Sequence, residues 1–339
     1  MKTLKILVSN AIAFGLAASI VLGLGLSSPA SAQSDDEETE EQESLSSKTF
    51  DAFNLRNIGP AFMSGRIADI AIVQDDPATW YVAVGSGGVW KTENAGTTWT
   101  SLFEGQGSYS IGSLGLDPSD PNRIWVGTGE NNGGRHLGFG DGIYKSNDGG
   151  KTWAKMGLEA SERISKIIVH PEDPDTVWVA AQGPLWSPGG ERGVYKTTDG
   201  GETWESVLAS GDYTGATDLL IDPRNPDRLY AAMWQRHRTV AAYVGGGPET
   251  GLWKSEDGGE NWEELKTGLP SGNMGKIGMA ISPMQPDVVY AAIELDRREG
   301  GVWKSTNRGA SWTKMSDAVG GGTGPHYYCL LYTSDAADE

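Results

Sequence analysis

Cysteine is almost absent from this chain of 339 residues. The single cysteine, Cys329, lies in the last eleven residues, so the sequence has no disulfide framework and no pair of thiols for redox chemistry. Three short catalytic motifs are also missing: the HExxH zinc motif, the GxSxG nucleophile elbow and the GxxxxGKS/T phosphate loop. We therefore expect neither a zinc-dependent protease, nor an α/β-hydrolase, nor a P-loop nucleotide-binding protein.

Positive charge is scarce. Lysine and arginine together number 27 against 45 aspartates and glutamates, which gives a formal net charge of −18 at pH 7. A body this acidic repels the phosphates of nucleic acids and the anionic surface of membranes. We expect neither as a partner.

Long apolar runs are equally rare, and the only one, Ile6 to Leu26, lies at the N-terminus. Lys2 and Lys5 precede it, and the small residues Ala30-Ser31-Ala32 follow it. This order is typical of an export signal cleaved after Ala32, with an uncleaved membrane anchor as the alternative. No second run approaches the length that spans a bilayer. The sequence thus predicts a signal peptide over 1–32 and a secreted, periplasmic or cell-surface protein.

The segments that flank the main body differ from it in composition. Residues 33–49 form an acidic linker with seven carboxylates between Asp35 and Glu43, and they lack the apolar surface needed to fold. Residues 329–339, CLLYTSDAADE, break the pattern described below and resemble a translated sequencing adapter. We therefore expect the folded part to cover 50–328, and the natural chain to continue beyond Tyr328.

A twelve-residue stretch recurs five times in this main body. Its clearest copy, Gly193 to Trp204, reads GVYKTTDGGETW, and every copy ends on a tryptophan. Successive tryptophans lie 54, 51, 58 and 50 residues apart, a period close to that of solenoids and propellers. The turns within the five copies span 92–99, 146–153, 197–204, 255–262 and 305–312.

Each copy has the chemistry of a hairpin turn. The Thr197 hydroxyl and the Asp199 carboxylate are placed to accept backbone N–H groups. Gly201 permits a positive φ, and Trp204 supplies a large ring to bury beneath the turn. We assign these residues a folding role rather than a direct part in binding or catalysis. The ten residues that define the five turns are Asn94, Trp99, Asp148, Trp153, Asp199, Trp204, Asp257, Trp262, Asn307 and Trp312.

Four strand signals, which we label A to D, occupy each repeat. In the third repeat, strand A covers Ile164 to His170, strand B covers Thr176 to Ala181, strand C covers Gly193 to Lys196, and strand D begins at Trp204. Short strands at even spacing, separated by turns rich in glycine and proline, favour a radially repeated β architecture. We predict an all-β fold, namely a β-propeller of four-stranded antiparallel blades, with five blades of a longer ring in this sequence.

The five Ser/Thr-x-Asp/Asn-x-Gly-x-Ser/Thr/Asn-Trp motifs resemble those of the Asp-box (BNR-repeat) β-propellers. This group includes sialidases, xyloglucanase-type tandem propellers and the sortilin-type receptor domain. The resemblance covers about Phe50 to Tyr328, and it is greatest to secreted bacterial proteins described as glycosyl hydrolase BNR-repeat or sortilin N-terminal-domain proteins. It implies a propeller fold, with glycoside hydrolysis as one activity to test.

Two motifs depart from these families. Sialidases carry an Arg-Ile-Pro motif ahead of their repeats, and the nearest match here, Arg66-Ile67-Ala68, lacks the proline. Xyloglucanase-type propellers place a catalytic aspartate after the first strand B, in a sequence like TDxGG. This chain reads VGSGG there, with Ser86 at the aspartate position.

Connectivity divides the loops between two faces. In an up-and-down blade the A–B and C–D turns share one face, and the B–C and D–A loops share the other. The first set is short and uniform, whereas the second is irregular, and variable loops on a repeated scaffold usually carry the binding site. We therefore place the site on the B–C/D–A face. Its B–C loops cover 130–141, 182–192, 234–249 and 294–300.

Five residues of these loops are candidates for ligand binding. Trp186 and Trp234 either stack on a sugar ring or a peptide, or fill gaps between blades. His136, Arg236 and His237 suit a carboxylate or sulfate group, with a solvated loop as the alternative.

Polar residues at equivalent positions of the inner strands are the catalytic candidates. Asp69 and Asp218 lie near the predicted channel mouth, with Arg66 just upstream as a further binding candidate. Together with Glu130, these carboxylates would serve as acid and base in glycoside cleavage if their separation leaves room for water. The alternative is that they brace the inner ring through ion pairs and hydrogen bonds. The five equivalent positions are Asp69, Ser113, Lys166, Asp218 and Gly278.

We predict no metal and no cofactor. The proline-rich A–B turns, such as 170–175, contain carboxylates but not the alternating ligands and glycine of a calcium loop. The predicted function is the binding of a glycan or peptide ligand on the B–C/D–A face of an exported propeller. Glycoside hydrolysis and a purely structural role at the cell surface are the alternatives.

Overall fold

The structure, a computed structural model, describes residues 66–131, 137–295 and 300–317. All of them belong to the second of two units, 56–339. The predicted signal peptide, acidic linker and C-terminal tail lie outside the described residues, and so does His136. None of the described residues forms a helix that is long and apolar enough to cross a bilayer. All of the described secondary-structure elements are β-strands except one 3₁₀ turn, Glu159–Ser161.

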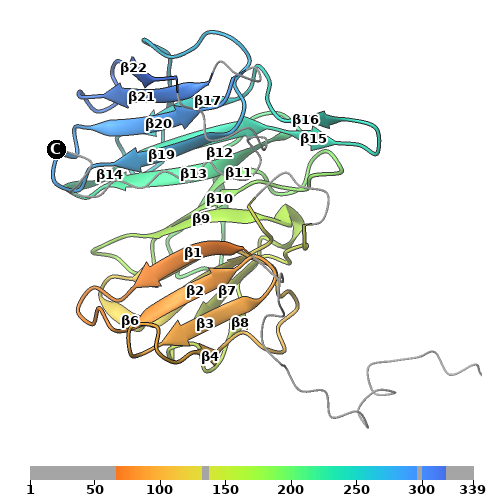
Figure 1. The fold of residues 1–339 in the computed structure, drawn as a ribbon, viewed down its shortest axis with the longest axis vertical. Helices are drawn as coiled ribbons and strands as arrows, with labels where there is room; N and C mark the ends of the chain where they lie inside the picture. The colour runs from red at the N-terminus through yellow and green to blue at the C-terminus, as the bar shows by residue number, and fades with distance from the viewer. Residues whose placement is uncertain (1–65, 132–136, 296–299, 318–339) are drawn as a thin grey trace, which may run out of the picture. The chain divides into compact units, whose positions relative to one another are not determined.

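The strands form five four-stranded antiparallel sheets, which we call blades 1 to 5 (Figure 1). Blade 1 is β1 (Ile67–Ile72), β2 (Trp80–Val84), β3 (Gly88–Thr92) and β4 (Thr100–Ser101). Blade 2 is β5 (Ile111–Asp117), β6 (Asp120–Thr128), β7 (Ile143–Ser146) and β8 (Ala154–Lys155). Blade 3 is β9 (Ile164–Val169), β10 (Val177–Ala181), β11 (Gly193–Thr197) and β12 (Glu205–Leu208).

Blade 4 is β13 (Thr214–Asp222), β14 (Asn225–Gln235), β17 (Gly251–Ser255) and β18 (Glu263–Leu265). Blade 5 is β19 (Ile277–Ile281), β20 (Val289–Ile293), β21 (Gly301–Ser305) and β22 (Thr313–Ser316). A two-stranded ribbon, β15 (His237–Arg238) and β16 (Tyr243–Val244), is inserted between strands B and C of blade 4.

These sheets are the blades of a β-propeller, as the sequence predicts. Within each blade the four strands pair in chain order A–B–C–D. The innermost strand of every blade contacts that of the next blade, in the series β1, β5, β9, β13 and β19. The five polar or small positions predicted to be equivalent do share one register: Asp69, Ser113, Lys166, Asp218 and Gly278 pair with Ala83, Gly127, Ala180, Ala232 and Ala292.

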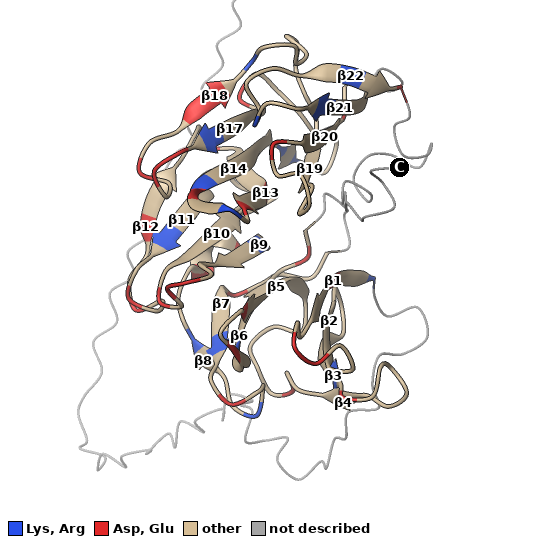
Figure 2. Cartoon of the chain, turned by 90° about the vertical axis from the view of Figure 1, so that its left-hand side faces the viewer, with Lys and Arg blue, Asp and Glu red and all other residues tan. Residues whose placement is uncertain are grey.

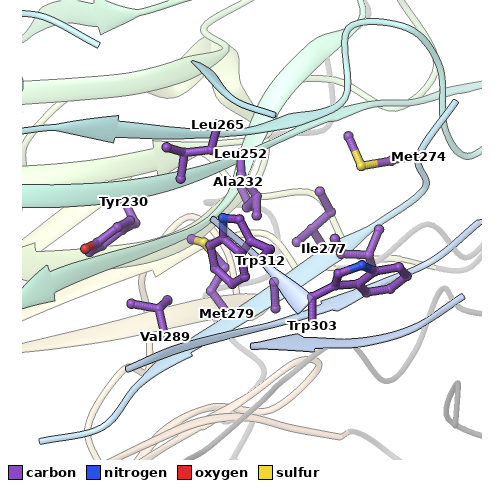
Figure 3. Packing of buried hydrophobic residues seen from close by; sticks show 12 residues of the cluster. Tyr230, Ala232, Leu252, Leu265, Met274, Ile277, Met279, Val289, Trp303 and Trp312 are labelled. Carbon is purple, nitrogen blue, oxygen red and sulfur yellow. The ribbon is translucent and has the colours of Figure 1, made fainter. Parts of the chain in front are cut away.

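The hydrophobic core is divided among the interfaces between successive blades. Figure 3 shows the cluster between blades 4 and 5, where Tyr230 and Leu252 of blade 4 meet Met279, Val289 and Trp303 of blade 5. Three further clusters fill the other interfaces between described blades. Because blades 2, 3 and 4 each pack against a described blade on both sides, strand residues of both of their faces are apolar, and the alternation of a half-exposed strand is weak.

The C–D turns are held by side-chain to backbone hydrogen bonds. In blade 3 the Gly201 N–H donates to Thr197 Oγ1 (3.0 Å), and the Thr203 N–H donates to Asp199 Oδ1 (2.9 Å). The Thr203 hydroxyl also donates to Asp199 Oδ2 (2.6 Å). Gly201 has a φ of 97°, which a residue with a Cβ adopts only with strain. The turn therefore depends on a hydroxyl, a carboxylate and a glycine at fixed spacing.

The two kinds of short turn lie together on one face. In all five described blades a C–D turn donates one N–H to the A–B turn of the same blade, as from Gly200 to the Asp175 carbonyl (2.9 Å). On the opposite face, the B–C loops of blades 2, 3 and 4 each donate to the D–A loop ahead of the next blade, as from Gly140 to the Glu162 carbonyl (2.8 Å). The irregular loops therefore form a continuous surface, the B–C/D–A face.

Long side chains join neighbouring blades on the A–B/C–D face. The ammonium group of Lys145 in blade 2 donates to the Gly200 carbonyl in the C–D turn of blade 3 (2.9 Å). The Trp178 indole of blade 3 donates to the Gly258 carbonyl of blade 4 (2.9 Å). Figure 2 shows the equivalent strand C lysines as blue segments on β11, β17 and β21. These contacts join blade 2 to blade 3 and blade 3 to blade 4.

Blade 1 presents an open apolar face. Ile67, Ile70 and Ile72 of β1 are 55%, 52% and 53% exposed. In blade 4, the residue at the position of Ile70 is Leu219, which is fully buried against blade 3. The residues of β1 are therefore exposed because β1 belongs to the first of the described blades, and not because they are less apolar than the equivalent residues of β13.

Candidate functional site

Residues at the ends of the two inner strands line the B–C/D–A face. The residue just before strand A accepts a backbone hydrogen bond from the residue just after strand B in the same blade. Gly85 donates to the Arg66 carbonyl (2.8 Å) in blade 1, and Glu294 donates to the Lys276 carbonyl (3.1 Å) in blade 5. The same pairing occurs in blade 3, between Gln182 and Arg163 (2.9 Å). Side chains at these positions are therefore brought to the channel mouth.

Polar groups from four blades converge on Asn131, which follows strand B of blade 2. The Lys276 ammonium of blade 5 donates to the Asn131 carbonyl (3.1 Å). The Asn131 side-chain amide donates to the Thr217 carbonyl of blade 4 (3.5 Å) and accepts a bond from the Gln182 amide of blade 3. The Gln182 amide also donates to Thr217 Oγ1 (3.1 Å). We call Asn131, Gln182, Thr217 and Lys276 the mouth cluster.

Two glutamates lie beside the mouth cluster. Glu130 is buried, forms an ion pair with Arg66, and donates its backbone N–H to Ser110 Oγ (3.1 Å). Glu294 accepts a weak hydrogen bond from the Lys276 N–H (3.3 Å). Burial raises the pKa of Glu294 from 4.5 to about 7, against the lowering effects of the N–H and charge of Lys276. Glu294 therefore changes its protonation state near neutral pH.

Asp69 and Asp218 occupy matching positions and make matching contacts. Oδ2 of Asp69 accepts the N–H of Leu114 in blade 2 (3.0 Å), and Oδ2 of Asp218 accepts the N–H of Met279 in blade 5 (2.8 Å). Each Oδ1 accepts the N–H of the following residue (2.9 Å). Burial raises the pKa of Asp218, while the nearby charge of Lys166 lowers it. Each carboxylate thus links the inner strand of its own blade to that of the next one.

The predicted binding residues are distributed differently from expectation. Trp186 lies in the B–C loop of blade 3 and is 40% exposed. The placement of Trp234 in a loop is wrong, because β14 continues to Gln235 and the Trp234 ring is only 1% exposed. Its indole donates to the Gly245 carbonyl (3.0 Å), and the Lys276 ammonium lies 5.5 Å from the ring centre. The buried ring of Trp234 therefore packs against Lys276 of the mouth cluster.

Arg236 and His237 also lie in or beside strands rather than in an open loop. Arg236 is buried and donates to the Gly183 carbonyl (3.0 Å). His237 belongs to β15, and its ring lies 4.6 Å from that of Tyr213. The structure thus places Arg66, Glu130, Trp186 and Arg236 on one face.

Sequence reasoning missed most of the mouth cluster. Gln182 and Lys276 lie one residue beyond the ends of β10 and β19, and Asn131 lies three residues beyond β6, so counting up to three residues outward from each strand would have found them. Two exposed aromatic rings were missed as well: Tyr109 in a D–A loop and Phe139 in a B–C loop are 67% and 60% exposed. The Ser108 hydroxyl donates to the Phe139 carbonyl (2.7 Å), which brings these two loops together.

No group of three or more histidine, cysteine, aspartate or glutamate side chains in the described part of the chain has the geometry of a metal site. The described residues of this face carry amide, ammonium, guanidinium, carboxylate and aromatic groups. Such groups hydrogen-bond hydroxyls and stack on flat apolar surfaces.

Comparison with known proteins supports the propeller assignment. A family described as "Sortilin, neurotensin receptor 3" (Sortilin-Vps10) matches residues 141–245. A probable oligoxyloglucan-reducing end-specific xyloglucanase of Neosartorya fischeri is 27% identical over 165 residues, which cover 45% of this chain. A xyloglucanase of Paenibacillus sp is 22% identical over 264 residues, which cover 70% of this chain. The photosystem II assembly lipoprotein Ycf48 of Trichormus variabilis is 30% identical over 141 residues, which cover 36% of this chain and 41% of Ycf48.

Solved structures show the same fold. The GH74 enzyme of Niastella koreensis matches with a TM-score of 0.59 at 17% identity, over 78% of this chain and 42% of the enzyme. An ancestral GH74 enzyme matches with a TM-score of 0.56 at 17% identity, over 76% of this chain and 34% of the enzyme. The matched regions span only 17% and 24% of the two xyloglucanases named above.

Proposed function

We propose that this protein is an exported propeller that binds a glycan on its B–C/D–A face. The observation that carries the proposal is the convergence of side-chain and backbone groups from four blades at the mouth cluster. Polar groups that meet from several blades at a channel mouth are suited to recognise a ligand with many hydroxyl groups, because each group has a fixed direction. Export follows from the predicted signal peptide.

Aromatic rings on the same face support a glycan over other ligands. Tyr109 and Trp186 are exposed on loops of this face, and an exposed aromatic ring has a flat apolar surface on which a sugar ring can stack. Aromatic rings of this kind can stack on the apolar face of a sugar, and amide and ammonium groups can hydrogen-bond its hydroxyl groups. A peptide ligand remains the alternative occupant of this face.

The similarity to xyloglucanases points in the same direction. Those relatives are named for action on xyloglucan, so xyloglucan is a sensible first ligand to test. The matched regions are a minor part of those enzymes, and the catalytic aspartate position of their motif is Ser86 here. We therefore propose binding first and keep hydrolysis as the alternative.

Glycoside hydrolysis is the second candidate, and Glu294 is the observation that favours it. A carboxyl group with a pKa of about 7 remains partly protonated at neutral pH, as a general acid requires. Glu130 beside the same mouth would then act as the second carboxylate, in a role that the sequence suggested for it together with Asp69 and Asp218. The contacts of Asp69 and Asp218 to the next blade favour the bracing role for these two.

A glycan array that includes xyloglucan oligosaccharides, together with a peptide library, tests the proposal on the full chain. The strongest glycan is then titrated by calorimetry against the wild type and Lys276→Ala. We expect at least a tenfold loss of affinity, since charge-assisted bonds of this kind contribute about 1.5–3 kcal/mol. Lys151→Ala, on an exposed C–D turn of the opposite face, is the matched control and should bind as the wild type does.

The same samples decide between the candidate functions. Binding without release of reducing ends supports the binding module, and steady release that is lost in Glu294→Gln supports the hydrolase. Binding to peptides alone, or an equal loss of glycan affinity in both lysine variants, would contradict the proposal.

A further inference from the structure

The described blades pack against one another through a repeated contact on their outer strands. The third residue after the tryptophan of each C–D turn packs with the tryptophan of the next blade. Leu102 of blade 1 shares a hydrophobic cluster with Trp153 of blade 2, and its backbone carbonyl accepts the indole N–H (2.8 Å). The other three pairs of this kind are Met156 with Trp204, Val207 with Trp262 and Leu265 with Trp312.

The inner strands add a second repeated contact. The residue that follows the register position of Asp69 is apolar in all five blades, and in blades 2 to 5 it belongs to the cluster shared with the preceding blade. Its exposed fractions there are 5%, 3%, 0% and 3%, for Leu114, Ile167, Leu219 and Met279. Both contacts thus recur at each of the four interfaces between described blades.

Two faces have no described blade against them. On blade 1, Ile70 is 52% exposed and Trp99 is 40% exposed; we call this the leading face. On blade 5, Met315 is the third residue after Trp312 and is 60% exposed, whereas the four equivalent residues of blades 1 to 4 are buried or half-buried. We call this the trailing face. Apolar side chains that lie open together on one surface are typical of an interaction site.

A lysine on the trailing face completes the match. The Lys304 ammonium lies over the Tyr290 ring of blade 5 (5.2 Å), as that of Lys145 lies over the Trp125 ring of blade 2 (4.8 Å). Lys145 donates to the Gly200 carbonyl in the C–D turn of the following blade (2.9 Å). Lys304 is therefore placed to donate to a C–D turn in the same way.

We infer that the trailing face of one copy of this chain packs on the leading face of a second copy. In this contact Met315 covers Trp99, and Lys304 donates to the carbonyl of Ala95, which occupies the position of Gly200 in the C–D turn of blade 1. A second copy is the occupant that the structure favours, because one chain carries both halves of the contact. Each half has the residue types that the four internal interfaces use.

The two faces differ from each other, so the contact is heterologous, and it either closes into a ring of copies or continues as a chain of them. Its formation follows mass action. At low protein concentration the copies are therefore separate, and chemical unfolding there measures a single copy with Ile70 exposed. The inference does not depend on the proposed function.

Analytical ultracentrifugation of the full chain, over about a hundredfold range of concentration, tests the inference. A reducing agent prevents disulfide links through Cys329. We expect the wild type to change from single copies to pairs or larger species as its concentration rises. Ile70→Asp and Met315→Asp each place a charge on one face, and each variant alone should stay single. Val240→Asp, at an 88% exposed side chain between β15 and β16, is the matched control and should associate as the wild type does.

A mixture of the two variants gives the decisive result. The Ile70→Asp copy keeps its trailing face and the Met315→Asp copy keeps its leading face, so the two should form pairs that neither forms alone. Circular dichroism checks folding; if either variant does not fold, Trp99→Ser replaces the first and Lys304→Glu the second.

Three results would overturn the inference. The first is a wild type that stays single at every concentration. The second is association of either variant alone, which would show that a face packs on its own kind or that another surface is used. The third is a mixture of the two variants that contains single copies only.

Discussion

Replacing Glu294 with glutamine should change how the stability of the protein depends on pH. Glu294 follows β20, is partly buried, and has a folded-state pKa of about 7 against an ordinary value of 4.5. The folded state therefore holds the proton more tightly than the unfolded state does. The stability associated with the protonated form is fully present below pH 4.5 and is lost as pH rises through about 7.

The magnitude follows from the size of the shift. A change from 4.5 to about 7 corresponds to roughly 3 kcal/mol for a fully buried carboxyl group. Because Glu294 is partly exposed, solvent screening reduces this, and we expect about 1–2 kcal/mol. Glutamine has a similar shape and no charge, so Glu294→Gln should abolish this part of the pH dependence.

Urea unfolding at pH 5 and pH 8 measures the effect. As pH rises from 5 to 8, the free energy of unfolding of the wild type should fall by about 1–2 kcal/mol more than that of Glu294→Gln. Glu205→Gln, on the exposed strand β12, controls for the general loss of a carboxylate and should follow the wild type. If the free energies of unfolding of wild type and Glu294→Gln differ by the same amount at pH 5 and at pH 8, the reasoning about this carboxyl group is refuted.

Two further stability predictions come from the packing between blades. Leu219→Ala should cost about 2–5 kcal/mol in chemical unfolding because the side chain is fully buried, whereas Ile70→Ala at the equivalent position should cost under about 1 kcal/mol. Equal losses would show that β1 is covered in solution. Trp178→Phe removes the indole bond to the Gly258 carbonyl (2.9 Å), and we expect a loss of about 1–3 kcal/mol; an unchanged midpoint would contradict the account of how blades 3 and 4 are joined.

Much of the fold could be predicted because the sequence repeats. Five tryptophan-ended turns fix the period, and the apolar runs between them fix four strands per period. Counting within that frame placed Asp69 and Asp218 at equivalent positions, and the register confirms this. Because the five copies follow one pattern, a wrong strand assignment in one blade can be recognised by comparison with the other four.

The prediction from the repeat is wrong where a strand of one blade is longer than the equivalent strands of the other blades. Strand β14 has 11 residues, whereas the equivalent β10 has 5. Nothing in the run LYAAMWQ marks the point at which the shorter strands end, and Trp234 was therefore assigned to a loop. Its indole N–H donates to the carbonyl of Gly245 (3.0 Å), which directly follows the inserted β15–β16 ribbon.

The mouth cluster could not be predicted for a different reason. Asn131 and Lys276 are 145 residues apart, and their contact exists only because blades 2 and 5 face the same channel mouth. Sequence spacing gives the order of blades but not the distance across the mouth. Arg163 and Arg236, which are both buried, show the same limit, since their burial depends on loops from blades 2, 3 and 4.

Hydrogen–deuterium exchange with and without the best oligosaccharide tests the central claim most directly. If the B–C/D–A face binds the ligand, amide exchange should slow in residues 182–192 and 274–277. Exchange in the C–D turns, such as 199–203, should stay unchanged. Protection confined to those turns, with none around Gln182 and Lys276, would contradict the placement of the site on this face.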